Sequence, residues 1–346
     1  MFKRIPAALI TAFACVALSL AMAATGPRVV AVGDVHGAYD AFVGILQRAS
    51  LLDSNLRWSG GNAVLVQTGD FIDRGPKSHE VMDLLMRLQR EARRQNGRVI
   101  VLLGNHEAMN IYGDLRYVTP EDYASFVDAR SPSRRAAAGS TMPLGFVEQR
   151  DAFGPTGSYG RWLRSLPAVV KIGDSLFVHG GLKAEFATWK VERINEAIAA
   201  DLKAFDAIRK YMVDEKIIHP YDTLGETITA VRAAEKLPES KDPRRRKVLD
   251  SFQSFGSWMT INMDGPLWFR GYDRWDEAEG SPQLRQLTQA FGVKRIVVGH
   301  TPQAGKIVAR FNGQVYLIDT GMLSSYVEGG RASALEIIGD KITPIY

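Results

Sequence analysis

Short apolar runs alternate with amphipathic segments over the first hundred residues of the chain. Three of the runs, rich in β-branched residues, are typical of buried strands: residues 29–32, 63–67 and 98–103. Two segments between them have apolar residues at helical spacing: residues 38–50 and 78–96. Ser78 is a candidate N-cap of the second helix, and Gly97 ends it. Strands alternating with helices predict parallel pairing through right-handed crossovers.

The middle of the chain has a different pattern. Helical spacing dominates two long segments, about 114–160 and 185–260, which we predict as helical insertions. In the first of these, Thr119 is a candidate capping residue with Pro120 at the first helical position. Two short apolar runs outside the insertions, 176–178 and 296–298, are predicted as further strands.

The last forty residues have the pattern of antiparallel pairs. Residues 306–310 and 314–318 flank Asn312-Gly313, a dipeptide that favours a two-residue hairpin turn. Residues 332–337 and 341–345 are predicted to pair in the same way around Gly339-Asp340.

The N-terminal segment is typical of an export signal. Lys3 and Arg4 precede an apolar stretch over residues 7–24, and small residues favour cleavage after Ala23. An uncleaved membrane anchor is disfavoured, because the stretch is alanine-rich and the first strand begins near Arg28. We therefore predict a signal peptide over residues 1–23, a periplasmic or secreted domain over 24–346, and no stable membrane insertion after cleavage.

Composition excludes several classes of protein. The formal charge of the 346-residue chain is +5, and omitting Lys3 and Arg4 from its 43 basic residues leaves a surplus of only three over 38 acidic residues. Such a balance gives no argument for nucleic-acid binding. Cys15 is the only cysteine and lies within the predicted signal, so disulfides and a cysteine-dependent phosphatase mechanism are both excluded for the mature chain.

Five glycine-framed blocks carry the candidate chemistry, and each follows a predicted strand. They read Gly33-Asp34-Val35-His36-Gly37, Gly69-Asp70-Phe71-Ile72-Asp73-Arg74-Gly75, Gly104-Asn105-His106-Glu107, His179-Gly180-Gly181 and Gly299-His300. Because ligands collect at the carboxyl ends of strands in α/β sheets, we expect the blocks to meet at one edge. Oxygen and imidazole donors together form the ligand set of a two-metal hydrolase, and the neighbouring glycines would let the backbone turn sharply.

The three longer blocks resemble the signature of the phosphoprotein phosphatase family of calcineurin-like metallophosphoesterases. The resemblance covers roughly residues 28–320 and implies an α/β fold with a central β-sandwich, flanking helices and a helical cap. It implies a metal-dependent phosphoric monoester hydrolase holding two divalent ions, with manganese favoured and iron, zinc or cobalt as alternatives.

Carried onto this sequence, the family pattern implies a role for each block residue. The first metal would be held by Asp34, His36 and Asp70. Asp70 would bridge to a second metal, held also by Asn105, His179 and His300. His106 would be the general acid, oriented by Asp73. Arg74 and Asn105 would bind the substrate phosphate.

A downstream segment narrows the resemblance within the family. Residues 266–272, Pro-Leu-Trp-Phe-Arg-Gly-Tyr, are similar to the corresponding segment of Shewanella-like protein phosphatases, as are Met109-Asn110 and residues 113–118. The resemblance implies that Arg270 is a second phosphate-binding arginine, that the partner is a phosphoprotein or phosphopeptide, and that phosphotyrosine is preferred. Two alternatives stay open: a diadenosine tetraphosphatase or small-molecule phosphoesterase, and, with less support, a non-catalytic metal- or phosphate-binding module.

Overall fold

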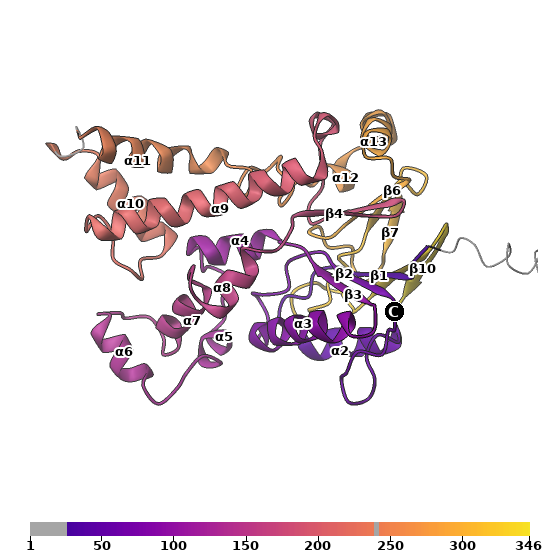
Figure 1. Ribbon diagram of the computed structural model, residues 1–346, viewed down its shortest axis with the longest axis horizontal. Coiled ribbons are helices and arrows are strands. Elements are labelled where there is room, and N and C mark those ends of the chain that lie inside the picture. Colours follow the sequence, from indigo (N-terminus) through magenta and orange to yellow (C-terminus); the bar gives the residue numbers. More distant parts are fainter. Residues whose placement is uncertain (1–25, 239–241) are drawn as a thin grey trace, which may run out of the picture.

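The computed structural model describes residues 26–238 and 242–346, so the predicted signal peptide lies outside the described residues. Two five-stranded sheets form a sandwich, helices cover its outer faces, and further helices extend to one side (Figure 1). This arrangement confirms the predicted α/β class with a central β-sandwich. Within the described ranges, no helix combines the length and the apolar character that crossing a membrane requires.

The first sheet has the order β10-β9-β1-β2-β3. Its strands are β1 (Val29–Val32), β2 (Val64–Gln67), β3 (Arg98–Val101), β9 (Ala334–Ile338) and β10 (Lys341–Ile345). Strands β1, β2 and β3 pair in parallel, as predicted from the strand–helix alternation. Strands β9 and β10 form the predicted antiparallel hairpin, and β9 pairs with β1. The sheet therefore joins the two ends of the described chain.

The second sheet has the order β4-β5-β6-β8-β7. Its strands are β4 (Val169–Ile172), β5 (Ser175–Val178), β6 (Arg295–Val298), β7 (Val308–Arg310) and β8 (Val315–Leu317). The hairpin of β7 and β8 is confirmed, but its loop is longer than predicted. Arg310 pairs with Val315, which leaves four loop residues, and Phe311, Asn312 and Gly313 all have positive φ.

Both faces of the central strands are buried, which explains why their sequences are continuous apolar runs. Side chains on the inner faces form one core between the sheets, with Val66, Phe177 and Val297 at its centre. The outer face of the first sheet packs against α2 (Tyr39–Arg48) and α3 (Ser78–Arg93). On the second sheet, α13 (Glu277–Phe291) and the short 3₁₀ helix η1 (Ala184–Thr188) take this place.

The predicted N-cap of α3 is wrong. Ser78 is the first residue of the helix, and Lys77 occupies the cap position without a side-chain hydrogen bond. The Ser78 hydroxyl instead accepts a hydrogen bond from the backbone N–H of Asp73, at 3.0 Å. Ser78 lies at the start of the helix, where the sequence pattern predicts a cap, but its hydroxyl bonds to the loop that contains Asp73.

Helices occupy both segments that the sequence pattern marked as helical. They are α5 (Pro120–Ala124), α6 (Ser131–Ala137), α7 (Phe146–Phe153), α8 (Ser158–Leu163), α9 (Val191–Asp214), α10 (Leu224–Ala234), α11 (Pro243–Gln253) and η3 (Ser254–Ser257), whereas α4 (Asn105–Tyr112) and α12 (Gly271–Arg274) lie outside both segments. The Thr119 cap is confirmed, since its hydroxyl accepts from the N–H of Asp122. Helices α9, α10 and α11 lie side by side and extend away from the sandwich (Figure 1).

Candidate metal centre

All six predicted metal ligands lie at the carboxyl ends of strands, but they come from both sheets. Four of them follow strands of the first sheet: Asp34, His36, Asp70 and Asn105. His179 follows β5 and His300 follows β6, in the second sheet. The single edge expected from the sequence is therefore the rim where two packed sheets meet.

Backbone strain at this rim is concentrated in the candidate ligands themselves. His36, Asp70 and His300 have φ of 48°, 55° and 67°. A left-handed conformation costs a non-glycine residue about 1–3 kcal/mol and persists where the surroundings enforce it. The sequence pattern assigns the sharp turns to the glycines, whereas in the structure three candidate ligands also make such turns.

Several of the neighbouring glycines are needed for close approach rather than for turning. A Cβ on Gly104 would lie 2.3 Å from Oδ1 of Asp70, and one on Gly33 would lie 2.4 Å from the carbonyl oxygen of Ile318. Neither glycine has a positive φ. The loops of the site are thus packed closely enough that an added methyl group would displace a candidate ligand.

We expect Gly104→Ala to destabilise the fold by about 1–3 kcal/mol, the usual cost of overpacking, and to reduce bound metal. Thermal unfolding and metal analysis measure the two effects. Gly44→Ala in α2 is the matched control, because a Cβ there meets nothing within 4 Å. That control should stabilise the protein by about 0.5–1 kcal/mol, as alanine does within helices. Normal metal content in Gly104→Ala would contradict the close-packing argument.

Three electron-pair donors lie around Nε2 of His179. Its Nε2 lies 2.9 Å from Oδ1 of Asn105, 3.2 Å from Nδ1 of His300 and 3.2 Å from Oδ2 of Asp70. Its Nδ1 lies 2.9 Å from the carbonyl oxygen of Thr68, which can only accept, so Nδ1 is the donor in that contact and Nε2 faces the other three groups.

The ring of His300 is fixed in a complementary way. Its Nε2 lies 3.1 Å from the carbonyl oxygen of Trp268, which leaves the lone pair of Nδ1 facing His179. Burial, and then the proximity of His179, hold the pKa of His300 well below its usual range, so the ring is neutral. Lone pairs that face one another without a shared proton suit a cation, and mixed nitrogen and oxygen donors suit a divalent transition metal.

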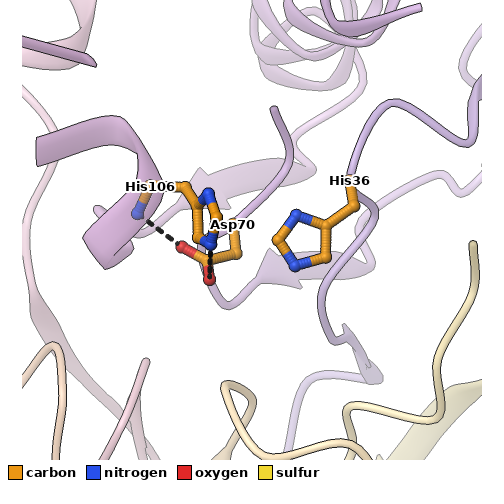
Figure 2. A group of neighbouring side chains, drawn as sticks. All are labelled: His36, Asp70 and His106. Carbon is orange, nitrogen blue, oxygen red and sulfur yellow. Dashed lines mark hydrogen bonds and ion pairs between the residues drawn. The ribbon is translucent and has the colours of Figure 1, made fainter. Parts of the chain in front are cut away.

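A second group of potential ligands shares Asp70 with the first. Donor atoms of His36, Asp70 and His106 lie within 4.8 Å of one another, as do those of Asp70, His179 and His300. Figure 2 shows Asp70 next to the ring of His106, with His36 beside the pair, and dashed lines from Asp70 to the backbone nitrogen and the ring of His106. Asp70 therefore occupies the position that a bridging ligand requires.

Asp34 lies beside this group rather than within it. Its Oδ2 is 3.9 Å from Nε2 of His36, and its Oδ1 accepts from the N–H of His300 at 2.9 Å. Burial, followed by the charges of Asp319 and Asp70, raises the pKa of Asp34 well above its usual range. A bound cation would offset this crowding of carboxylates.

His106 and Asp73 form a buried pair at the start of α4. Nδ1 of His106 lies 2.7 Å from Oδ2 of Asp73, and its Nε2 faces Asp70 at 3.9 Å and Nη2 of Arg74 at 3.3 Å. Burial alone would lower the pKa of His106, but the charges of Asp70 and Asp73 and the hydrogen bond to Asp73 raise it. The ring is thus suited to hold a proton at Nε2, toward the metal groups.

Arg74 is held between two tyrosines that sequence analysis did not assign. Its guanidinium carbon lies 4.4 Å from the ring centre of Tyr117 and 3.9 Å from that of Tyr326, distances at which cation–π attraction operates. Nε of Arg74 is buried without a hydrogen-bond partner. Tyr117 lies within a segment quoted for the family resemblance, whereas Tyr326 comes from a loop after β8 that carries no motif.

Arg270 and Glu107 hold the loops that carry candidate ligands. Nη1 of Arg270 donates to the carbonyl oxygen of His300 at 3.0 Å. Glu107 accepts from the backbone N–H groups of Gly104, Asp70 and Phe71 at 2.8–3.0 Å. Burial, and then the charge of Asp70, raise the pKa of Glu107 to about 7. Its contacts are with backbone groups, as expected for a residue that supports the ligand loop.

Two sheets with a histidine- and carboxylate-lined rim define a metallophosphoesterase fold, and comparison with known proteins agrees. Residues 27–304 match the family described as Calcineurin-like phosphoesterase. The chain belongs to this family. It is 29% identical over 299 residues to Shewanella-like protein phosphatase 1 of Plasmodium berghei, covering 85% of this chain and 67% of that protein.

Two further proteins are similar to this chain. Shewanella-like protein phosphatase 2 of Arabidopsis thaliana is 35% identical over 204 residues, which cover 51% of this chain and 52% of the relative. The crystal structure of a cold-active protein-tyrosine phosphatase from a psychrophilic Shewanella species superposes with a TM-score of 0.64 at 27% identity, over 92% of this chain and 77% of that one. The family domain and the homologous phosphatases support a metal-dependent phosphoric monoester hydrolase.

Proposed function

We propose that the protein is a dinuclear-metal phosphatase that hydrolyses phosphoproteins and prefers phosphotyrosine. The observation that carries the proposal is the pair of donor groups that share Asp70, since two-metal phosphatases need one ligand between their ions. Asp34 and His36 would hold one divalent ion with Asp70, and Asn105, His179 and His300 would hold the other. When bound, such ions supply charge neutralisation of the phosphoryl group and activation of water. Manganese is our proposed metal, with iron, zinc or cobalt as alternatives.

His106 supplies the proton in this proposal. As water attacks phosphorus and the bond to the leaving oxygen breaks, Nε2 of His106 donates its proton to that oxygen. Asp73, 2.7 Å from Nδ1, fixes the ring and stabilises its protonated form. The raised pKa of His106 keeps this proton available near neutral pH.

Arg74, Arg270 and Asn105 bind the substrate phosphate. The planar guanidinium of Arg74 is oriented by the rings of Tyr117 and Tyr326 and lies against Nε2 of His106. The Nη1 of Arg270 is engaged with the backbone of His300, which anchors this guanidinium beside the candidate second metal.

Arg270→Ala should raise KM for a phosphopeptide about tenfold or more and weaken inhibition by inorganic phosphate, because a charged hydrogen-bond donor contributes about 1.5–3 kcal/mol. Arg270 also contacts His300, so metal content should be measured on the same variant. Arg274→Ala at the end of α12 is the control, since it removes an arginine four residues away. Unchanged KM and unchanged phosphate inhibition would show that Arg270 does not bind phosphate.

The preference for phosphotyrosine has two supports. A protein with a similar fold, from Shewanella, is described as a protein-tyrosine phosphatase. In this chain, Tyr326 is 45% exposed and lies beside Arg74 and His36, so an aromatic surface adjoins the proposed phosphate site. Such a surface favours a flat aromatic leaving group over the short aliphatic chain of serine or threonine.

Turnover of phosphotyrosine and phosphothreonine versions of one peptide, with manganese and after chelation, tests the proposal. We expect chelator-sensitive turnover that is faster on phosphotyrosine. Equal turnover of both peptides would retain the metal mechanism and remove the preference. Hydrolysis of diadenosine tetraphosphate or small phosphoesters, but of neither peptide, would support the alternative enzymes. The absence of any turnover with metal bound would support a binding module.

We also propose that the enzyme acts outside the cytoplasm. The support is the charged start at Lys3 and Arg4, the apolar stretch over residues 7–24 and the small residues before position 24. Mass spectrometry of the protein recovered from the periplasm or medium should find Ala24 at its N-terminus, whereas an intact Met1 in the cytoplasm would contradict export.

A further inference from the structure

The His106–Asp73 pair is connected by buried hydrogen bonds to a helix outside the motif blocks. Oδ1 of Asp73 accepts from Nδ2 of Asn110 at 2.8 Å, while its Oδ2 faces the ring of His106. Oδ1 of Asn110 accepts from Nε2 of Gln149, in α7, at 3.1 Å. Asn110 and Gln149 are 1% and 2% exposed, so water does not replace these bonds.

The hydrogen-bond partners in this network determine which atom the Asn110 amide presents to each neighbour. An asparagine side chain can present either its oxygen or its amide nitrogen. Because the Asp73 carboxylate only accepts, the amide nitrogen of Asn110 faces Asp73, and Oδ1 of Asn110 is left to accept from Nε2 of Gln149. The same nitrogen also donates to the carbonyl oxygen of His106 at 3.1 Å. With both of its oxygens engaged, the Asp73 carboxylate cannot rotate away from Nδ1 of His106.

The main chain of Asp73 is held from a second helix. Its N–H donates to the Ser78 hydroxyl, which in turn donates to Oδ2 of Asp122 at 3.0 Å. Asp122 belongs to α5 and also accepts from the N–H of Ser78 at 3.1 Å. Asp73 has a φ of 68°, a conformation that such external contacts must maintain. Helices α5 and α7 thus constrain the backbone and the side chain of one residue.

We propose that Asn110 and Gln149 are positioning residues for the reaction: they orient Asp73, and through it the proton on His106, so α7 forms part of the catalytic support. This inference rests on the proposed role of His106 as general acid. A misoriented acid should matter most when the departing oxygen is strongly basic, because a good leaving group departs without a proton.

Two variants test the proposal with phenyl phosphate and p-nitrophenyl phosphate. Gln149→Met removes the amide at similar length, and Asn110→Asp replaces the donor facing Asp73 with oxygen at the same shape. For each, kcat on phenyl phosphate should fall about tenfold or more, with a fall of about twofold or less on p-nitrophenyl phosphate and little change in KM. Glu148→Met is the matched control, since Glu148 precedes Gln149 in α7 and pairs with Arg134 instead.

The proposal is overturned if both substrates lose activity equally in the folded variants, or if Glu148→Met shows the same selective loss. Thermal unfolding shows which variants are folded, and Asn110→Asp decides the matter if Gln149→Met is not. The variant His106→Asn distinguishes the proposed general acid from the proposed positioning residues. If His106→Asn itself shows no selective loss on phenyl phosphate, the general acid assignment fails. If it does while both positioning variants do not, only the present proposal fails.

Discussion

Replacing Asp70 with Asn is expected to abolish turnover and to remove metal from both sites at once. Asp70 is the one residue common to the two donor groups, and its Oδ2 lies 3.2 Å from Nε2 of His179 and 3.9 Å from Nε2 of His106. An amide of the same shape keeps the packing but removes the charge that offsets two cations. The metals are expected to stabilise the transition state by several kcal/mol, and losing this stabilisation corresponds to a decrease in kcat of about 10³-fold or more.

Metal analysis and phosphatase assays on the same preparation check this result. Asp40→Asn is the control, because its carboxylate is 78% exposed and pairs with Lys77 at the surface. It should retain normal activity and metal content, since exposed ion pairs contribute little. Full occupancy of two ions in Asp70→Asn would remove Asp70 as the bridging ligand, whatever the activity.

His106→Asn should separate chemistry from metal binding. Metal content is expected to stay near normal, and kcat on phosphotyrosine should fall about 10²–10⁴-fold, the usual contribution of a positioned acid. The side chain lies within 4.8 Å of His36 and Asp70 in a group that geometry alone would admit as a metal site. Its Nδ1 contact with Asp73 favours proton donation instead, because that carboxylate stabilises the protonated ring.

The same variant therefore tests two assignments. If metal is lost together with activity, His106 is a ligand and the acid must be sought elsewhere. If metal is retained and turnover is unaltered, His106 is neither. Arg87→Met in α3 is a suitable control for metal or activity lost during purification, because Arg87 contacts Leu56 and Glu91 and lies away from the site.

Much of the sandwich could be predicted from sequence because its central strands are short, apolar and directly followed by motif residues. Strands β1, β2 and β3 lie as expected, and the 3.6-residue spacing indicated α2 and α3. Strand β4 was missed although its signal was present, since Val169-Val170 precede the two-residue turn Gly173-Asp174. Its exposed lysine, Lys171, interrupts the apolar pattern.

The supporting contacts of the candidate site could not be predicted, because no local pattern encodes them. Tyr326 approaches Arg74 from a loop about 250 residues further along the chain, and Gln149 reaches Asn110 from α7. Each is an ordinary residue in its own segment. The motif blocks, in contrast, combine histidine, aspartate and glycine at fixed spacing. The sequence could therefore indicate the candidate chemistry more readily than the contacts that orient the motif side chains.

The candidate ligands are divided between two sheets, and this division affects when the site can form during synthesis of the chain. The hydrogen bond from His300 to Asp34 joins residues 266 positions apart, and β9 must return to pair with β1. Domains that emerge from the ribosome fold progressively, and long-range pairing is slow. A nascent chain can expose Asp34, His36 and Asp70 long before His300 is synthesised. Under the proposed assignment, the complete metal site forms only after translation, and a chain truncated before His300 is expected to be inactive even with its first motifs intact.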